Sequence, residues 1–110
     1  MSRQPQALDY TSVTVADTAI TIFGNDALVT SAPIGARSFV GTMETAAIRA
    51  RGDGTDPSAS EGMLIGSGDQ VYLGESEFAH MKFIRDTGTS GVLRGHFYNV
   101  EVDVILGKVS

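Results

Sequence analysis

The 110-residue sequence contains no cysteine and no tryptophan. The lack of cysteine excludes disulfide bonds, thiolate metal sites and a cysteine nucleophile. Long apolar runs are also missing, so no transmembrane helix is expected. The first residues lack the apolar segment of a secretion signal. We therefore expect a protein that is made and assembled in a cytoplasm.

Positive charge is scarce as well. Eight lysines and arginines stand against thirteen acidic residues, for a net charge of -5. Because phosphate binding requires clustered cations, a nucleic-acid partner is not expected. The lack of long apolar runs likewise predicts no membrane partner. Arg49 and Arg51 are spaced by two and share one face of a strand, and Arg37 lies nearby in sequence. The three arginines are expected either to form a solvated, salt-bridged surface or to contact an acidic patch on a partner.

Short β-prone runs, separated by glycine and other turn-forming residues, are the main pattern along the chain. No window has a convincing helical period. This pattern predicts one all-β domain over residues 1–110, a single antiparallel β-sandwich (jelly-roll-like) of about seven to eight short strands. The expected strands are residues 12–15, 19–23, 37–43, 47–51, 70–73, 79–85, 92–99 and 100–106.

The two ends of the chain are expected to reach neighbouring subunits. Residues 1–7 are mostly polar and predict an N-terminal arm, and residues 99–110 predict a C-terminal extension strand. Val100, Val102 and Val104 alternate with acidic residues, as in a half-buried edge strand. Such an edge can pair with another chain, so these valines are candidate partner contacts.

Candidate ligand sites in the sequence are few. His80 and His96 are the only histidines, and neither has an acidic neighbour at metal-ligand spacing. The carboxylates of the 52–62 loop are a conceivable calcium site, but their spacing departs from the EF-hand pattern. The string Arg51-Gly52-Asp53 can be an adhesion motif or simply the start of a turn.

Catalytic patterns are missing. No Gly-x-Ser-x-Gly motif and no phosphate-binding glycine loop occurs in the sequence. We expect no catalytic residues, no cofactor and no metal, and hence a protein that is not an enzyme.

The central part of the chain, residues 36–98, carries a distinctive succession of motifs. An arginine-bearing strand enters the loop Asp53-Gly54-Thr55-Asp56-Pro57-Ser58-Ala59, a Gly-Asp turn follows at residues 68–69, and later strands end in Arg85 and in His96-Phe97-Tyr98. In this succession the chain resembles small virion structural proteins of tailed bacteriophages. The resemblance implies a head-decoration (cement) or head–tail accessory subunit with a β-sandwich body and no enzymatic activity. Residues 99–110 extend past the usual closing strand, which leaves the oligomeric state open.

The resemblance implies a capsid decoration protein that stabilises the head by bridging neighbouring subunits. Its partners would be the major capsid protein or other virion subunits, with a homo-oligomer expected, and its location would be the virion. The alternative is a receptor- or carbohydrate-binding module of a tail or fibre, which needs an exposed aromatic platform. With Tyr10, Tyr72 and Tyr98 as the only tyrosines, the sequence offers little for one.

Overall fold

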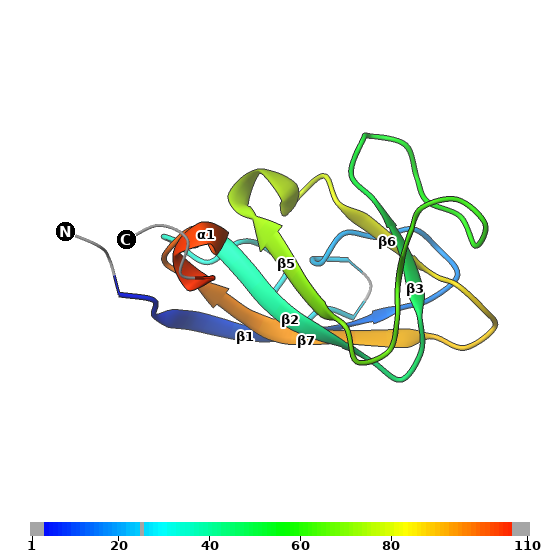
Figure 1. Cartoon of the computed structure of the whole chain (residues 1–110), viewed down its shortest axis with the longest axis horizontal. Coiled ribbons are helices and arrows are strands. Elements are labelled where there is room, and N and C mark those ends of the chain that lie inside the picture. Colours follow the sequence, from blue (N-terminus) through cyan, green and yellow to red (C-terminus); the bar gives the residue numbers. More distant parts are fainter. Residues whose placement is uncertain (1–3, 25, 107–110) are drawn as a thin grey trace.

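The chain folds into two antiparallel β-sheets that face each other across one hydrophobic core (Figure 1). The structure is a computed structural model that describes residues 4–24 and 26–106. A four-stranded sheet has the order β1-β7-β2-β5, and a three-stranded sheet has the order β4-β3-β6. The strands are β1 Ala7–Val15, β2 Ser38–Glu44, β3 Ile48–Arg51, β4 Met63–Ile65, β5 Gln70–Gly74, β6 Lys82–Arg85 and β7 Gly91–Tyr98. The predicted all-β sandwich fold is thereby confirmed.

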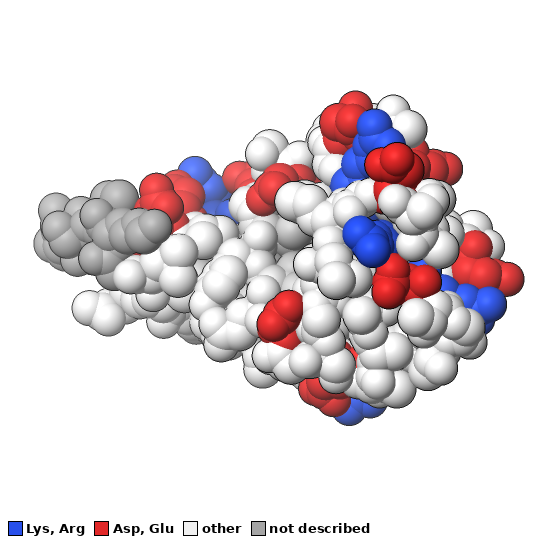
Figure 2. Space-filling view, turned by 45° about the vertical axis from the view of Figure 1, so that its right-hand side comes forward, with Lys and Arg blue, Asp and Glu red and all other residues white. Residues whose placement is uncertain are grey.

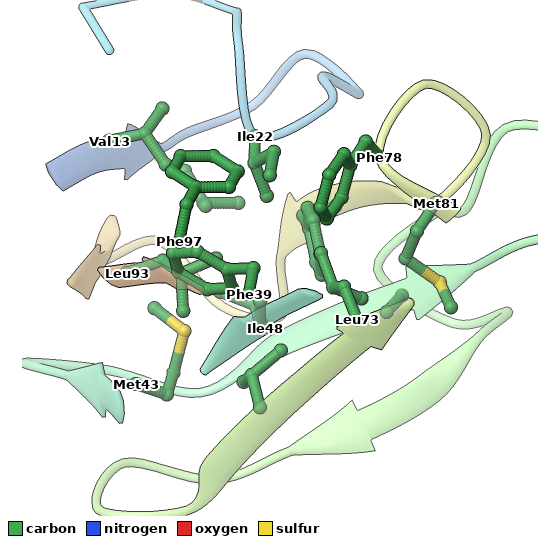
Figure 3. Close-up of a cluster of buried hydrophobic side chains, with 14 of the residues drawn as sticks. Val13, Ile22, Phe39, Met43, Ile48, Leu73, Phe78, Met81, Leu93 and Phe97 are labelled. Atoms are coloured by element: carbon green, nitrogen blue, oxygen red, sulfur yellow. The ribbon is translucent and has the colours of Figure 1, made fainter. Parts of the chain in front are cut away.

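Phenylalanines fill the centre of the core (Figure 3). Phe97 of β7 is fully buried, and its ring centroid lies 5.3 Å from those of both Phe39 and Phe78. Phe23 stacks on the same ring at 5.9 Å. Because β7 runs between β1 and β2, its inward side chains lie at the middle of the four-stranded sheet. Phe97 therefore joins residues that are distant in sequence.

Two facing glycines let Phe39 lie flat on the inner face of this sheet. Gly41 of β2 pairs with Gly95 of β7. A Cβ atom at Gly95 would lie 2.3 Å from the Val40 carbonyl oxygen and 2.8 Å from the Phe39 ring. One at Gly41 would lie 2.6 Å from the Arg94 carbonyl oxygen. The core at this point therefore requires glycine on both strands.

One side of the sandwich is closed by the segment that follows β1. Ile20 and Phe83 exchange backbone hydrogen bonds of 3.0 and 2.7 Å, and the amide of Arg85 donates to the carbonyl of Ala16 at 2.9 Å. Ile22 is fully buried behind this contact. The prediction of a strand over residues 19–23 is wrong, because only the isolated Ile20–Phe83 bridge forms. The segment seals the free edge of β6.

Strand boundaries differ from the sequence prediction at three further places. Strand β1 begins at Ala7, five residues before the expected strand 12–15. Strand β4 was not expected. The expected strand 79–85 is limited to Lys82–Arg85, because the chain first makes the 3₁₀ turn η1, Glu75–Glu77. A hydrogen bond of 2.8 Å from the Gly74 amide to Glu77 Oε1 stabilises this turn. It carries Phe78 into the core, where only 4% of its surface is exposed.

The predicted C-terminal strand over residues 100–106, part of the expected extension 99–110, is wrong. The chain instead forms a short helix, α1 Val102–Ile105, in which the amide of Leu106 donates to the carbonyl of Val102 at 2.9 Å. The reason is a lack of neighbouring strands in the part of the chain that the structure describes. Tyr98 is the last residue of β7 that pairs with either neighbour: it lies opposite Ser38 of β2 and opposite Ala7 of β1. A strand continuing β7 would have unpaired backbone groups on both sides.

The N-terminal arm is shorter than expected where it can be described. Ala7 belongs to β1, and among the described arm residues Gln6 is tied to Asn99. The Gln6 amide donates to Asn99 Oδ1 at 2.8 Å, and the Asn99 amide donates to the Gln6 carbonyl at 3.2 Å. Residues 1–3 and 107–110 lie outside the described residues, so the ends of the predicted arm and extension are not covered.

A hydrogen-bonded carboxylate holds the loop after the closing segment against β1. Asp26 accepts from the Thr14 amide at 2.7 Å and from its hydroxyl at 2.8 Å. Both hydrogen bonds lower the pKa of Asp26 from its ordinary value of 3.8, and the bond from the Thr14 amide has the larger effect. A carboxyl with a lowered pKa in the folded state stabilises the fold above its unfolded-state pKa, and that stabilisation disappears as the pH falls through the folded-state pKa.

We therefore expect Asp26→Asn to destabilise the protein at pH 7 by at most about 1 kcal/mol, because the group is exposed to solvent. The difference from wild type should vanish once the pH falls well below 3.8. Urea unfolding of both proteins at several pH values measures it. A difference that persisted unchanged at the lowest pH would contradict this role of the carboxylate.

Candidate functional site

The arginines of β3 form a salt-bridged strand face. Arg49 and Arg51 point to the same side of the strand. Arg49 Nε lies 2.8 Å from Asp86 Oδ1, and its Nη1 donates to the Gly62 carbonyl at 3.1 Å. Arg51 Nε lies 2.8 Å from Asp53 Oδ1. The first of the two readings of these arginines, a salt-bridged face, is what the structure shows for this pair.

Arg37 lies apart from that pair, next to the four-stranded sheet. Its Nη2 lies 2.6 Å from Glu101 Oε1, beside the start of α1. Its Nε lies 3.1 Å from Glu75 Oε1, without the alignment of a hydrogen bond. Arg37 thus joins η1 to the C-terminal helix, and the three arginines do not share one surface. In Figure 2 most of the basic atoms likewise lie beside acidic ones.

In the Arg51-Gly52-Asp53 string, the two charged side chains form a salt bridge with each other. The hydrogen bond from Arg51 lowers the pKa of Asp53 and raises the pKa of Arg51. Farther along the same loop, Asp56 Oδ1 lies 2.9 Å from Lys82 Nζ. Two carboxylates of the conceivable calcium site are therefore engaged by cationic side chains, and the adhesion tripeptide pairs with itself rather than presenting separate charges.

The histidines occupy unrelated positions. His80 follows η1, whereas His96 lies on the outer face of β7. Within residues 4–24 and 26–106, no group of three or more His, Cys, Asp or Glu side chains is placed to hold a metal ion. No helix in the same residues is long and apolar enough to cross a membrane.

The three valines proposed as partner contacts are wholly or partly buried within the chain itself. Val100 is only 3% exposed, and its carbonyl accepts a 2.7 Å hydrogen bond from the hydroxyl of buried Ser38. Val102 and Val104 are half-buried in α1. They cannot be donated as a strand in this conformation, because the helix uses the backbone groups that a strand would offer.

A different surface of the molecule is open, and it was not predicted from the sequence. On the side opposite the closing segment, the edge strands β4 and β5 leave a gap between the sheets, which we call the open seam. Its floor consists of Ala50, Val71 and Phe83, and its rim is formed by Met63 and Met81. A cavity of about 140 Å³ lies between the sheets there. A wider depression of about 550 Å³ adjoins it at Arg51, Gly52 and Gly62.

Apolar side chains at the open seam are uncovered. Met63 is 59% exposed and Leu64 is 56% exposed, on opposite faces of β4. In the described part of the chain, β4 is hydrogen-bonded to β3 alone and β5 to β2 alone. Both strands therefore present an unpaired backbone edge next to accessible core side chains. The apolar run Met63-Leu64-Ile65 between two glycines was the available sequence signal.

The open seam can bind an extended polypeptide. A strand that paired with the edge of β4 would satisfy its free amide and carbonyl groups. An apolar side chain from that strand could then fill the cavity beside Met63 and Met81. Comparison of the chain with protein-family models, with curated proteins and with solved structures found no match, so its function has to be inferred from these surfaces.

Proposed function

We propose that the chain is a non-enzymatic structural protein of a tailed-bacteriophage virion, and specifically a capsid decoration (cement) subunit. It would stabilise the head by bridging neighbouring subunits. The major capsid protein or another virion subunit would be its partner. The observation that carries the proposal is the open seam, where a small sandwich leaves two strand edges and part of its core uncovered on one side.

The physical argument concerns exposed edges. Small β-proteins usually protect edge strands with charge, proline or covering segments, because unprotected edges pair with other chains. Here the free edge of β6 is covered by the segment around Ile20, but the exposed strand β4 carries Met63 and Leu64 and no charge. A surface of this kind favours a protein whose working state has a neighbouring chain at β4.

The charged surface supports the same proposal. The described cations of β3 and of the Arg37 site all have acidic partners within the chain. They stabilise loops around the sandwich, so recognition by the seam would depend on backbone pairing and apolar contact. Binding of that kind should change little with salt concentration, because screening acts on charges.

The double variant Met63→Ser with Leu64→Ser tests the seam. Both side chains are exposed, so the stability of the isolated protein should change by no more than about 0.5 kcal/mol per substitution. The affinity for heads that lack the protein should fall by at least about tenfold, because apolar anchors at an interface carry most of its binding energy. Cosedimentation of purified protein with heads measures the affinity.

The matched control is Leu28→Ser, which removes a leucine that is 64% exposed in the loop after β1. This control should bind heads like wild type. Equal binding by the double variant and wild type would contradict the role of the seam. Failure of all three proteins to bind heads would contradict the proposed function itself.

A further inference from the structure

All three tyrosines of the chain come from strands of the four-stranded sheet, and two of them belong to a row on its outer face. The strand register aligns Tyr10 of β1 with His96 of β7, His96 with Val40 of β2, and Val40 with Tyr72 of β5. Tyr10 is 44% exposed and Tyr72 is 36% exposed. The Tyr10 and His96 rings meet edge to face at 5.4 Å, and Tyr98 lies 6.4 Å beyond His96 on the same strand.

A polar row lies beside this aromatic row, two residues along each strand. The register aligns Arg94 of β7 with Thr42 of β2, and Thr42 with Gln70 of β5. A groove of about 310 Å³ is lined by Tyr10, Val40 and His96 of the first row, by the three residues of the polar row and by Glu44. Tyr72 stands at the β5 end of the aromatic row, outside the lining of the groove. The groove therefore has aromatic rings along one wall and hydrogen-bonding side chains along the other.

The polar groups of the groove are largely available. Arg94 Nη1 and Glu44 Oε1 are 3.7 Å apart, a loose pair in which each side chain is nearly half exposed. Gln70 accepts a hydrogen bond from the Tyr72 hydroxyl, which leaves its amide nitrogen free to donate. Within the described residues, the Thr42 side chain makes no hydrogen bond. Donors and acceptors are thus both offered to a ligand.

The chemistry of this groove fits a neutral oligosaccharide. Tyrosine combines a large apolar ring with a polar hydroxyl, and such rings give contact area at a low cost in side-chain entropy. Sugar rings present apolar C–H faces and hydroxyls that need donors and acceptors at once. The paired charges of Arg94 and Glu44 cancel, so the groove offers no net charge to attract a polyanion.

We infer that the outer face of the four-stranded sheet is a binding site for a neutral oligosaccharide, which lies across the strands between Tyr10 and Tyr72. These residues are three strand spacings apart, or about 14 Å, which leaves room for more than one sugar ring. The inference does not rest on the proposed virion role. The groove lies on the outer face of β1, β2, β5 and β7, whereas the floor of the open seam lies between the two sheets. The two sites meet at β5, where Gln70 lines both and Tyr72 lines the seam cavity.

The test is an array of neutral oligosaccharides, followed by titration calorimetry with any oligosaccharide that binds. Tyr10→Ala and Tyr72→Ala should each weaken binding by at least about tenfold, while Tyr10→Phe, which keeps the ring, should retain most of it. Leu64→Ala, on the other sheet, is the control and should bind like wild type.

Binding to the wild type can also be mapped by NMR, which does not depend on any variant folding. Amide shifts on adding the oligosaccharide should concentrate at His96, Thr42 and Gln70. The inference is overturned if no neutral oligosaccharide binds at millimolar concentration, if binding survives both alanine substitutions, or if the shifts lie elsewhere. It is equally overturned if only proline-rich peptides, which also use aromatic grooves, occupy the site.

Discussion

Replacing Phe97 by alanine is expected to lower the free energy of unfolding by about 3–5 kcal/mol, the cost of removing a large buried aromatic side chain. The Phe97 ring is fully buried and contacts the rings of Phe23, Phe39 and Phe78. These partners come from the closing segment, β2 and the residue after η1. The substitution therefore leaves a cavity that no single element can collapse to fill.

Urea denaturation followed by circular dichroism measures this change. Phe97→Leu is the conservative control and should lose much less, because it keeps most of the buried apolar volume. Since domains of this size are stable by about 5–15 kcal/mol, the alanine variant should be close to unfolding at room temperature. A loss below about 1 kcal/mol would show that Phe97 is not the centre of the core.

Gly95→Ala is expected to cost about 3 kcal/mol, at the upper end of the range for overpacking. The added methyl group would lie 2.3 Å from the Val40 carbonyl oxygen and 2.5 Å from Gly41 Cα. Both obstacles are backbone atoms of the neighbouring strand, so relief requires the strands to separate. The hydrogen bonds between β2 and β7 at the middle of the sheet would weaken as a result.

Gly88→Ala is the matched control, because a Cβ atom there would meet nothing within 4 Å. It lies in the turn before β7 and should change stability by no more than about 0.5 kcal/mol. Thermal or urea unfolding of both variants, compared with wild type, separates the crowded position from the open one. Equal stability of the two variants would contradict the close approach of β2 and β7.

The sequence was sufficient to predict the strands in the middle of the chain. The glycine-bounded runs over residues 37–43, 47–51, 70–73 and 92–99 become β2, β3, β5 and β7 with small changes at their ends. In β7 the side chains alternate as expected of a strand, with Leu93 and Phe97 inward and Arg94 and His96 outward. These strands have a partner on at least one side, and their local patterns agree with that environment.

The valine alternation after Asn99 shows where a local pattern is insufficient. Val100, Val102 and Val104 have the period of a strand, yet helix α1 forms because no strand of the described residues 4–24 and 26–106 extends far enough to pair with them. The interactions that hold this end are Arg37 with Glu101 and Ser38 with Val100. They join residues more than sixty positions apart, and sequence spacing alone does not reveal them.

Both candidate binding surfaces depend on strand register in the same way. The open seam exists because β4 and β5 are edge strands on the same side, and the groove exists because Tyr10, His96 and Tyr72 fall on one row. Each tyrosine looks isolated in the sequence. The sheet order β1-β7-β2-β5, in which distant strands are neighbours, is what aligns them.

The two surfaces can be altered independently. Met63→Ser with Leu64→Ser should leave oligosaccharide binding unchanged, and Tyr10→Ala should leave binding to heads unchanged. Tyr72 does not enter this comparison, because it also lines the cavity of the open seam. If one set of substitutions abolished both activities while the protein stayed folded, the seam and the groove would be parts of one site.

The most direct measurement is the location of the protein in particles purified from cells that carry its gene. Mass spectrometry of those particles and cryo-electron microscopy of the heads should find it in many copies on the head surface, with a strand of a neighbouring subunit beside β4. Its absence from purified particles, or its presence there with β4 and Met63 uncovered, would contradict the proposal.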